Sequence, residues 1–290
     1  MHLTPSEIAF NIQITAKKER KKMTKLNQFL VYDELPLWSA PFGLTLLDTI
    51  RMRSHINVLD IGSGSGFPML ELAERLGKTS MVYGLDPSQD AIDMITTKKE
   101  LKGIFNARII QGVAEEIPFP DEYFGLIVAN NGLNNVADQR KALEECYRVS
   151  EKGSQMVLTM NLPHTMVEFY DAFEETLMEL GLNDEVGKMH LHISDKRKPV
   201  DYLKELILSR GFVIKTINVD GFKIRYHDGT SFFNHYFIRK AFMGPWKAIL
   251  PGSLEGKVMG LLEEKLNRLA EQQGELTMSV PYVCFDCSKP

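Results

Sequence analysis

Three glycines at alternating positions, placed directly behind a short apolar run, constrain the fold of this chain more than any other feature. Residues 58–61 are apolar enough to form a buried strand, and Gly62, Gly64 and Gly66 follow them. Glycine tolerates positive φ angles and lets a ligand approach the backbone closely. Residues 68–76 then carry apolar side chains at helical spacing. The sequence therefore predicts a strand, a glycine loop that holds a ligand, and a helix.

The spacing of these glycines argues against two common nucleotide sites. A dinucleotide fingerprint counted from Gly62 needs its third glycine at position 67, where the chain has Phe67. A P-loop is excluded because no Gly-Lys-Ser/Thr follows. The next apolar run, residues 81–85, ends at Asp86, and a carboxylate there is placed to accept hydrogen bonds from a ribose diol. The pattern indicates a ribose-containing ligand other than a nicotinamide dinucleotide.

Strands and helices are predicted to alternate along the first half of the chain, with Ser88 and Asp138 as N-caps of two helices. The strands after the first are predicted at 81–85, 107–110, 126–129 and 155–160. Such alternation implies parallel pairing with right-handed crossovers, and continuous apolar runs imply that both faces are covered. The predicted fold class is therefore α/β, a doubly wound Rossmann-like sheet over about residues 56–162.

The second half of the chain has a less regular pattern. Helices are predicted at 166–180, at 201–209 and from a cap at Ser253 to Gly274, and strands from Phe212 and over 276–285. Pro281 lies inside the last strand, and proline cannot donate a hydrogen bond to a neighbouring strand. We therefore expect that strand at a sheet edge or with a bulge.

In combination, four segments are specific enough to indicate a family. They are VLDIGSGSG at 58–66, GLDPS at 84–88, GVAEEIPFPDEYFGLIVAN at 112–130 and ALEECYRVSEKG at 142–153. With them the chain resembles the class I S-adenosylmethionine-dependent methyltransferases, within the group that methylates small molecules. The resemblance implies S-adenosylmethionine as cofactor and S-adenosylhomocysteine as product. It also implies a seven-stranded sheet whose last strand is antiparallel, with helical cap insertions.

The resemblance assigns roles by position. The loop from Asp60 to Gly66 would wrap the methionyl part of the cofactor, and Asp86 would bind the ribose hydroxyls. The full set of cofactor residues that it implies is Asp60, Gly62, Ser63, Gly64, Gly66, Asp86, Pro87, Ala114, Glu115 and Asn130. The chain departs from the family at Val113, where an Asp or Asn usually accepts from the adenine amino group. Backbone groups or Glu115 would then read the adenine.

Methyl transfer from a sulfonium is an in-line displacement that depends mainly on orientation and exclusion of water. A general base helps only where the acceptor has a proton to lose. Asn131, beside the reaction centre, and His235, in the aromatic-rich segment 222–250, are the catalytic candidates. The alternative for this segment is a packed cap with a structural histidine. The acceptor site is also expected to involve residues 32–42 and the helix after the fifth strand.

The expected organisation is an N-terminal helical lid (1–50), a cofactor-binding core (51–162) and a remainder with cap insertions for the substrate (163–290). The acceptor is expected to be a small or medium-sized, partly apolar metabolite, methylated at carbon, oxygen or nitrogen. Two alternatives stay open: a nucleic-acid or protein methyltransferase, and a non-catalytic cofactor-binding protein.

The bulk composition bears on the partners of this chain. The net charge of -4, from 34 basic and 38 acidic residues, argues against a broad nucleic-acid surface. No metal is expected, because Cys284 and Cys287 would point to opposite faces of one strand. Without a signal-like start or an apolar run of ~20 residues, we expect a cytoplasmic protein, monomer or homodimer, with no membrane span.

Overall fold

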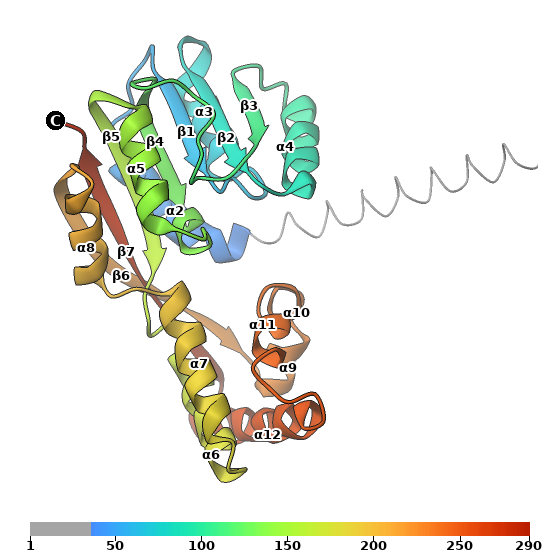
Figure 1. The fold of residues 1–290 in the computed structure, drawn as a ribbon. Helices are drawn as coiled ribbons and strands as arrows, with labels where there is room; N and C mark the ends of the chain where they lie inside the picture. Colours follow the sequence, from blue (N-terminus) through green and yellow to red (C-terminus); the bar gives the residue numbers. More distant parts are fainter. Residues whose placement is uncertain (1–35) are drawn as a thin grey trace, which may run out of the picture. The chain divides into compact units, whose positions relative to one another are not determined.

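The computed structural model describes residues 36–290, in which residues 41–290 form one compact unit around a seven-stranded sheet (Figure 1). The strand order is β3-β2-β1-β4-β5-β7-β6. The strands are β1 (Asn57–Ile61), β2 (Met81–Asp86), β3 (Ala107–Gln111), β4 (Phe124–Asn130), β5 (Ser150–Asn161), β6 (Val213–Tyr226) and β7 (Leu276–Ser288). β1 to β5 pair in parallel, and β7 runs antiparallel to both β5 and β6. The predicted Rossmann-like sheet with an antiparallel last strand is confirmed.

Helices connect and cover these strands. They are α2 (Pro36–Thr49), α3 (Met69–Leu76), α4 (Gln89–Lys102), α5 (Gln139–Val149), α6 (Val167–Glu179), α7 (Asn183–Lys196), α8 (Val200–Ser209), α9 (Gly229–Asn234), α10 (Tyr236–Ala241), α11 (Met243–Lys247) and α12 (Glu255–Gln273). The Ser88 and Asp138 side chains accept hydrogen bonds from backbone N–H groups in the first turns of α4 and α5, as predicted. Ser253 does not cap α12, because that helix begins one residue later, with Leu254 as its N-cap.

Two apolar layers, one on each face of the sheet, stabilise the fold. Leu46 of α2 and Met69 of α3 share one layer with strand residues such as Val58, while Leu143 of α5 and Leu206 of α8 share the other with residues such as Leu59. Adjacent strand residues thus enter opposite layers, and this explains the continuous apolar runs in the sequence. Cys284 and Cys287 likewise fall into different layers, as buried free thiols.

The expectation that the Pro281 strand lies at an edge or carries a bulge is wrong. β7 is an internal strand between β5 and β6, and Pro281 pairs in regular register with Gly221. The Pro281 carbonyl accepts from the N–H of Leu162, one residue past the end of β5. Because N–H and C=O of one strand residue point to the same side, the missing proline N–H faces the point where β5 has already ended. An internal strand therefore tolerates this proline.

Beyond the end of β5, β6 and β7 continue as a two-stranded ribbon as far as the pair Tyr226 and Leu276. Helices α6 and α12 pack on β7 and α9 packs on β6 around this ribbon (Figure 1). Trp246 stacks on Phe169 with ring centroids 3.9 Å apart and donates from Nε1 to the Tyr170 hydroxyl at 3.0 Å. Phe232 and Trp246 are fully buried, so these two aromatics belong to a packed cap core. None of the helices in residues 36–290 has the length and apolar character that a membrane crossing needs.

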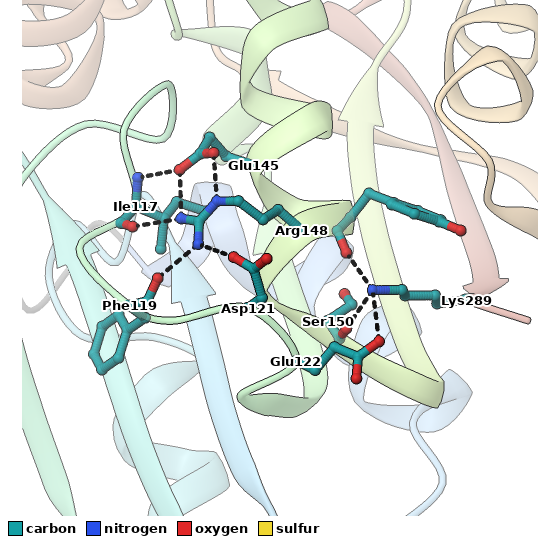
Figure 2. A network of polar contacts seen from close by, with 9 residues as sticks. Ile117, Phe119, Asp121, Glu122, Glu145, Arg148, Ser150 and Lys289 are labelled. Atoms are coloured by element: carbon teal, nitrogen blue, oxygen red, sulfur yellow. Dashed lines mark hydrogen bonds and ion pairs between the residues drawn. The ribbon is translucent and has the colours of Figure 1, made fainter.

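A guanidinium group fastens the loop before β4 to α5 (Figure 2). Arg148 donates to both carboxylate oxygens of Glu145 at 2.7 Å and to the Asp121 carboxylate at 2.9 Å. It also donates to the carbonyl oxygens of Ile117 and Phe119, and the Ile117 N–H in turn donates to Glu145. The hydrogen bonds from Arg148 lower the pKa of Glu145. This network holds the segment that leads from the third to the fourth strand.

We expect Arg148→Ala to lower the free energy of unfolding by about 1.5–3 kcal/mol, because it removes the charged donor from the Glu145 carboxylate and from two carbonyl groups, and among residues 36–290 only the Ile117 N–H still donates to Glu145. Denaturant unfolding at pH 7 measures this loss. Arg75→Ala is the matched control, since Arg75 makes only a solvent-exposed pair with Glu71, worth about 0.2–1 kcal/mol at most. Equal losses for the two variants would contradict the role assigned to the network.

Candidate cofactor site

The site lies where the strand order reverses, between the carboxyl ends of β1 and β4. In open α/β sheets this switch point is where ligands bind. The loops after the two strands touch, since a Cβ atom on Gly132 would lie 2.0 Å from the carbonyl oxygen of Ile61. A Cβ atom on Gly62 would lie 2.8 Å from the Cα atom of Gly132. The predicted site residues do not include Gly132. Its place two residues after the end of β4 is the sequence feature that could have pointed to it.

The glycine loop has the conformation that its composition predicts. Gly62, Gly64 and Gly66 have φ angles of 70°, 50° and 97°. The N–H of Gly62 donates to the Leu85 carbonyl at 2.8 Å, which ties the loop to the end of β2. A Cβ atom on Gly64 would meet only the carbonyl oxygen of Gly62, at 3.9 Å. The space beside Gly64 is therefore open to a ligand.

Asp86, at the end of β2, holds the same loop through its carboxylate. Oδ2 accepts from the N–H of Gly64 and Oδ1 from the N–H of Ser88, both at 2.9 Å. An ionised carboxylate has about four acceptor sites, so these bonds leave capacity for a ligand hydroxyl. Asp86 is predicted to bind ribose, and the structure adds a second contact that positions Gly64.

Asp60 is completely buried beneath the glycine loop. Neither carboxylate oxygen has a hydrogen-bond partner of normal geometry among the described residues. Burial raises the pKa of Asp60 to about 8, the Asp86 carboxylate adds to the rise, and the Met69 N–H and Ser63 hydroxyl oppose it. A buried carboxyl group without a positively charged partner is costly to ionise, and a cationic ligand group would relieve that cost.

Amide side chains cluster at the ends of β4 and β5. Thr159 Oγ1 donates to Asn130 Oδ1 at 2.9 Å. Asn134 Nδ2 donates to the side-chain oxygens of Asn131 and Asn161. Asn131 has a φ angle of 60°, and its buried Nδ2 group has no partner in the part of the chain that the structure describes. Asn130 and Asn131 thus both lie at the carboxyl end of β4, while their roles stay predictions.

The residues predicted for adenine lie after β2 and β3. Ala114 is buried, Val113 is 46% exposed, and the Pro87 carbonyl accepts from the Gln111 side chain. Glu115 Oε1 accepts from the N–H groups of Ala137 and Asp138, just before α5. Only Oε2 of Glu115 is left for a ligand, so adenine recognition by Glu115 stays a prediction.

His235 lies exposed between α9 and α10, with its ring edge-on to Tyr226 at a centroid distance of 5.5 Å. Burial raises the pKa of Tyr226 to about 12. The structure thus places His235 against β6 in the cap, whereas Asp60 and Asp86 lie at the glycine loop. Its role as a base stays a prediction.

A family model described as a methyltransferase domain matches residues 52–204, more than half of the chain. The chain is also 31% identical over 193 residues to a ubiquinone/menaquinone biosynthesis C-methyltransferase of Psychromonas ingrahamii, covering 63% of this chain and 77% of that protein. The chain belongs to the class I S-adenosylmethionine-dependent methyltransferases. It is an enzyme whose cofactor is S-adenosylmethionine.

Two further comparisons describe this methyltransferase. It is 35% identical over 107 residues to a demethylmenaquinone methyltransferase of Listeria welshimeri, an alignment that covers 37% of this chain and 45% of that protein. Its fold is similar to that of the YcgJ protein of Bacillus subtilis, with a TM-score of 0.56 and 19% identity, over 86% of this chain and 97% of that one. That likeness supports the fold alone.

Proposed function

We propose that this methyltransferase methylates a ring carbon of a small, partly apolar acceptor of the quinol type. The observation that carries the acceptor class is the 31% identity to a C-methyltransferase of ubiquinone and menaquinone biosynthesis. Two partly buried aromatic side chains of β6 support it: Tyr226 lies edge-on to Phe232 of the cap core, and Phe222 lies edge-on to Phe42 of α2. Residues 163–290 would then serve the acceptor and residues 51–162 the cofactor, while the proposed lid 1–50 lies mostly outside the described residues.

The residues at the switch point fit the cofactor. The orphaned Asp60 carboxyl group is suited to the cationic ammonium group of the methionyl part, and the open space beside Gly64 leaves room for its backbone-like chain. The remaining acceptor capacity of Asp86 suits the ribose diol. When bound, S-adenosylmethionine supplies an electrophilic methyl group on sulfur with a neutral leaving group. The protein's task is then to orient the acceptor and exclude water.

Carbon methylation of a quinol places one demand on the protein beyond orientation. A ring carbon becomes a good nucleophile when the neighbouring hydroxyl loses its proton, so a group that accepts or stabilises that charge would help. The amide groups of Asn130 and Asn131 lie at the edge of the sheet where the resemblance places the reaction centre. His235 is the other candidate.

The acceptor proposal is tested by incubating the full chain with methyl-labelled S-adenosylmethionine and, separately, a 1,4-naphthoquinol with one unsubstituted ring carbon, a phenol, an amine and a nucleic acid. We expect label on the quinol ring carbon, located by mass spectrometry and NMR. A Gly64→Val variant serves as the control for label that arises without the cofactor site. Label only on oxygen, nitrogen or nucleic acid would overturn the proposal.

Asp86→Ala is expected to weaken S-adenosylmethionine binding by about 1.5–3 kcal/mol, roughly 10–100-fold in Kd, because charge-assisted hydrogen bonds are lost. Titration calorimetry with S-adenosylmethionine and S-adenosylhomocysteine measures the change. Asp90→Ala is the control, since Asp90 is an exposed carboxylate in the first turn of α4. Unchanged affinity in Asp86→Ala would show that the ribose assignment is wrong.

A further inference from the structure

A cavity of about 420 Å³ lies where α7 meets α8, beside the segment that follows β5. Its walls include Arg197, Lys198 and Ser194, together with the apolar surfaces of Ile193 and Tyr202. None of its lining residues is acidic, and none belongs to the glycine loop, the end of β2 or the segment after β4. This cavity is therefore separate in its residues from the cofactor site.

Arg197 is the unusual residue of this cavity, because it is only 4% exposed. Its Nη1 group donates to the Thr165 carbonyl at 2.9 Å, and its guanidinium carbon lies 5.1 Å from the centre of the Tyr170 ring. Tyr170 is itself fixed by the hydrogen bond from Trp246. The guanidinium group is thus held in one place by the cap core.

No carboxylate pairs with Arg197 in residues 36–290, and Thr165 is the acceptor of its single hydrogen bond there. A guanidinium group has five N–H donors, so most of its capacity is unused. Buried charged groups are normally paired, because an uncompensated charge away from water is costly. Burial lowers the pKa of His192, and the positive charge of Arg197 lowers it further.

We propose that this cavity binds a small organic molecule through an oxyanion group, a phosphate or a carboxylate, with Arg197 as its principal ligand. The planar guanidinium fork matches either oxyanion geometrically. Lys198, whose Nζ atom lies 5.8 Å from the centre of the Tyr202 ring, adds a second positive charge at the rim. Ile193 and Tyr202 offer apolar surface to the rest of the molecule, since the cavity exceeds the size of a bare anion.

The proposal is tested on the full chain by calorimetry and thermal unfolding with four probes at constant ionic strength: inorganic phosphate, phenyl phosphate, benzoate and phenol. We expect saturable binding of phenyl phosphate, benzoate or both, weaker binding of inorganic phosphate and none of phenol. Binding of phenyl phosphate but not benzoate would identify a phosphate as the recognised group, and binding of benzoate but not phenyl phosphate would identify a carboxylate. Absence of binding by every oxyanion, or equal binding of phenol, would overturn the proposal.

Three variants separate recognition from folding. Arg197→Gln is expected to weaken oxyanion binding about tenfold or more, and Lys198→Gln by a smaller factor. Arg197→Lys keeps the positive charge without the planar fork, so its oxyanion affinity should lie between that of the unchanged protein and that of Arg197→Gln. This variant keeps the test valid if the glutamine variant folds poorly. Lys215→Gln, at an exposed position of β6, is the control. Undiminished oxyanion affinity in a folded Arg197→Gln protein would refute the site, and S-adenosylmethionine affinity reports independently on the cofactor site.

Discussion

Replacing Gly64 by valine is expected to abolish measurable binding of S-adenosylmethionine and methyl transfer while the protein remains folded. A Cβ atom on Gly64 meets no protein atom closer than 3.9 Å, so the new side chain would occupy the open space of the loop and leave the core unchanged. That space is the one assigned to the cofactor, and a branched side chain would exclude it sterically. Binding is measured by calorimetry and folding by denaturant unfolding.

The expected loss must be separated from backbone strain, because Gly64 has a φ angle of 50° that side chains rarely adopt. Gly103→Val supplies the matched control. Gly103 has a φ angle of 65° at the end of α4, and a Cβ atom there meets nothing within 4 Å. Both variants should lose similar stability, about 1–3 kcal/mol, but only Gly64→Val should lose the cofactor. Normal cofactor affinity in Gly64→Val would show that the loop assignment is wrong.

The parallel half of the sheet was predictable because its determinants are local. Most of these strands contain a continuous apolar run, and the helices that follow β1, β2 and β4 have a cap or a stop residue nearby. The glycine loop has few alternative conformations. Ser88 and Asp138 illustrate this, since each caps its helix through N–H groups no more than three residues away. Right-handed crossovers then leave little choice of topology.

The antiparallel end of the sheet was less predictable because it depends on where distant strands stop. Pro281 is compatible with an internal strand only because β5 ends opposite it, and the sequence around Pro281 holds no information about that end. The same holds for the aromatic segment, where residues 222–226 extend β6 and Trp246 fills the cap core. Periodicity within one segment cannot tell which other segment covers it.

The candidate site shows the same division. The glycine loop and Asp86 were found by spacing, but the second function of Asp86, as an acceptor for the Gly64 N–H, requires the fold. Gly132 matters through its approach to Ile61, about 70 residues earlier in the chain, which spacing does not reveal. The sequence does not reveal the Arg197 cavity either, because an arginine near a helix end is normally solvated and only the fold shows that this one is buried.

The affinity for S-adenosylmethionine is expected to rise with pH up to about pH 8. Burial raises the pKa of Asp60 to about 8, so its carboxyl group is mostly protonated at pH 7 in the free protein. A cationic ammonium group placed against it favours the ionised form and lowers that pKa. Cofactor binding should therefore release up to about one proton at pH 7, and Kd should fall by up to roughly tenfold per pH unit between pH 6 and pH 8.

Calorimetry in buffers of different ionisation enthalpy measures the released proton directly. Asp60→Asn is the matched control, because it keeps the shape of the side chain, cannot titrate, and leaves the ligand's own titration the same for both proteins. The variant should bind more weakly and release correspondingly fewer protons. Equal proton release by the two proteins would mean that the ammonium group does not lie against Asp60.

The same group gives the unfolding of the unliganded protein a sign that can be checked independently. Because the folded pKa of Asp60 is raised from 3.8 to about 8, its contribution to stability is present below pH 3.8 and is lost as pH rises toward 8. The expected decline is up to about 1.4 kcal/mol per pH unit within that window, and it should be absent in Asp60→Asn. Saturating S-adenosylmethionine should also remove much of the decline, because the ammonium group stabilises the ionised carboxylate. A folded state that carries this cost without its ligand is consistent with a carboxyl group placed for binding rather than for stability.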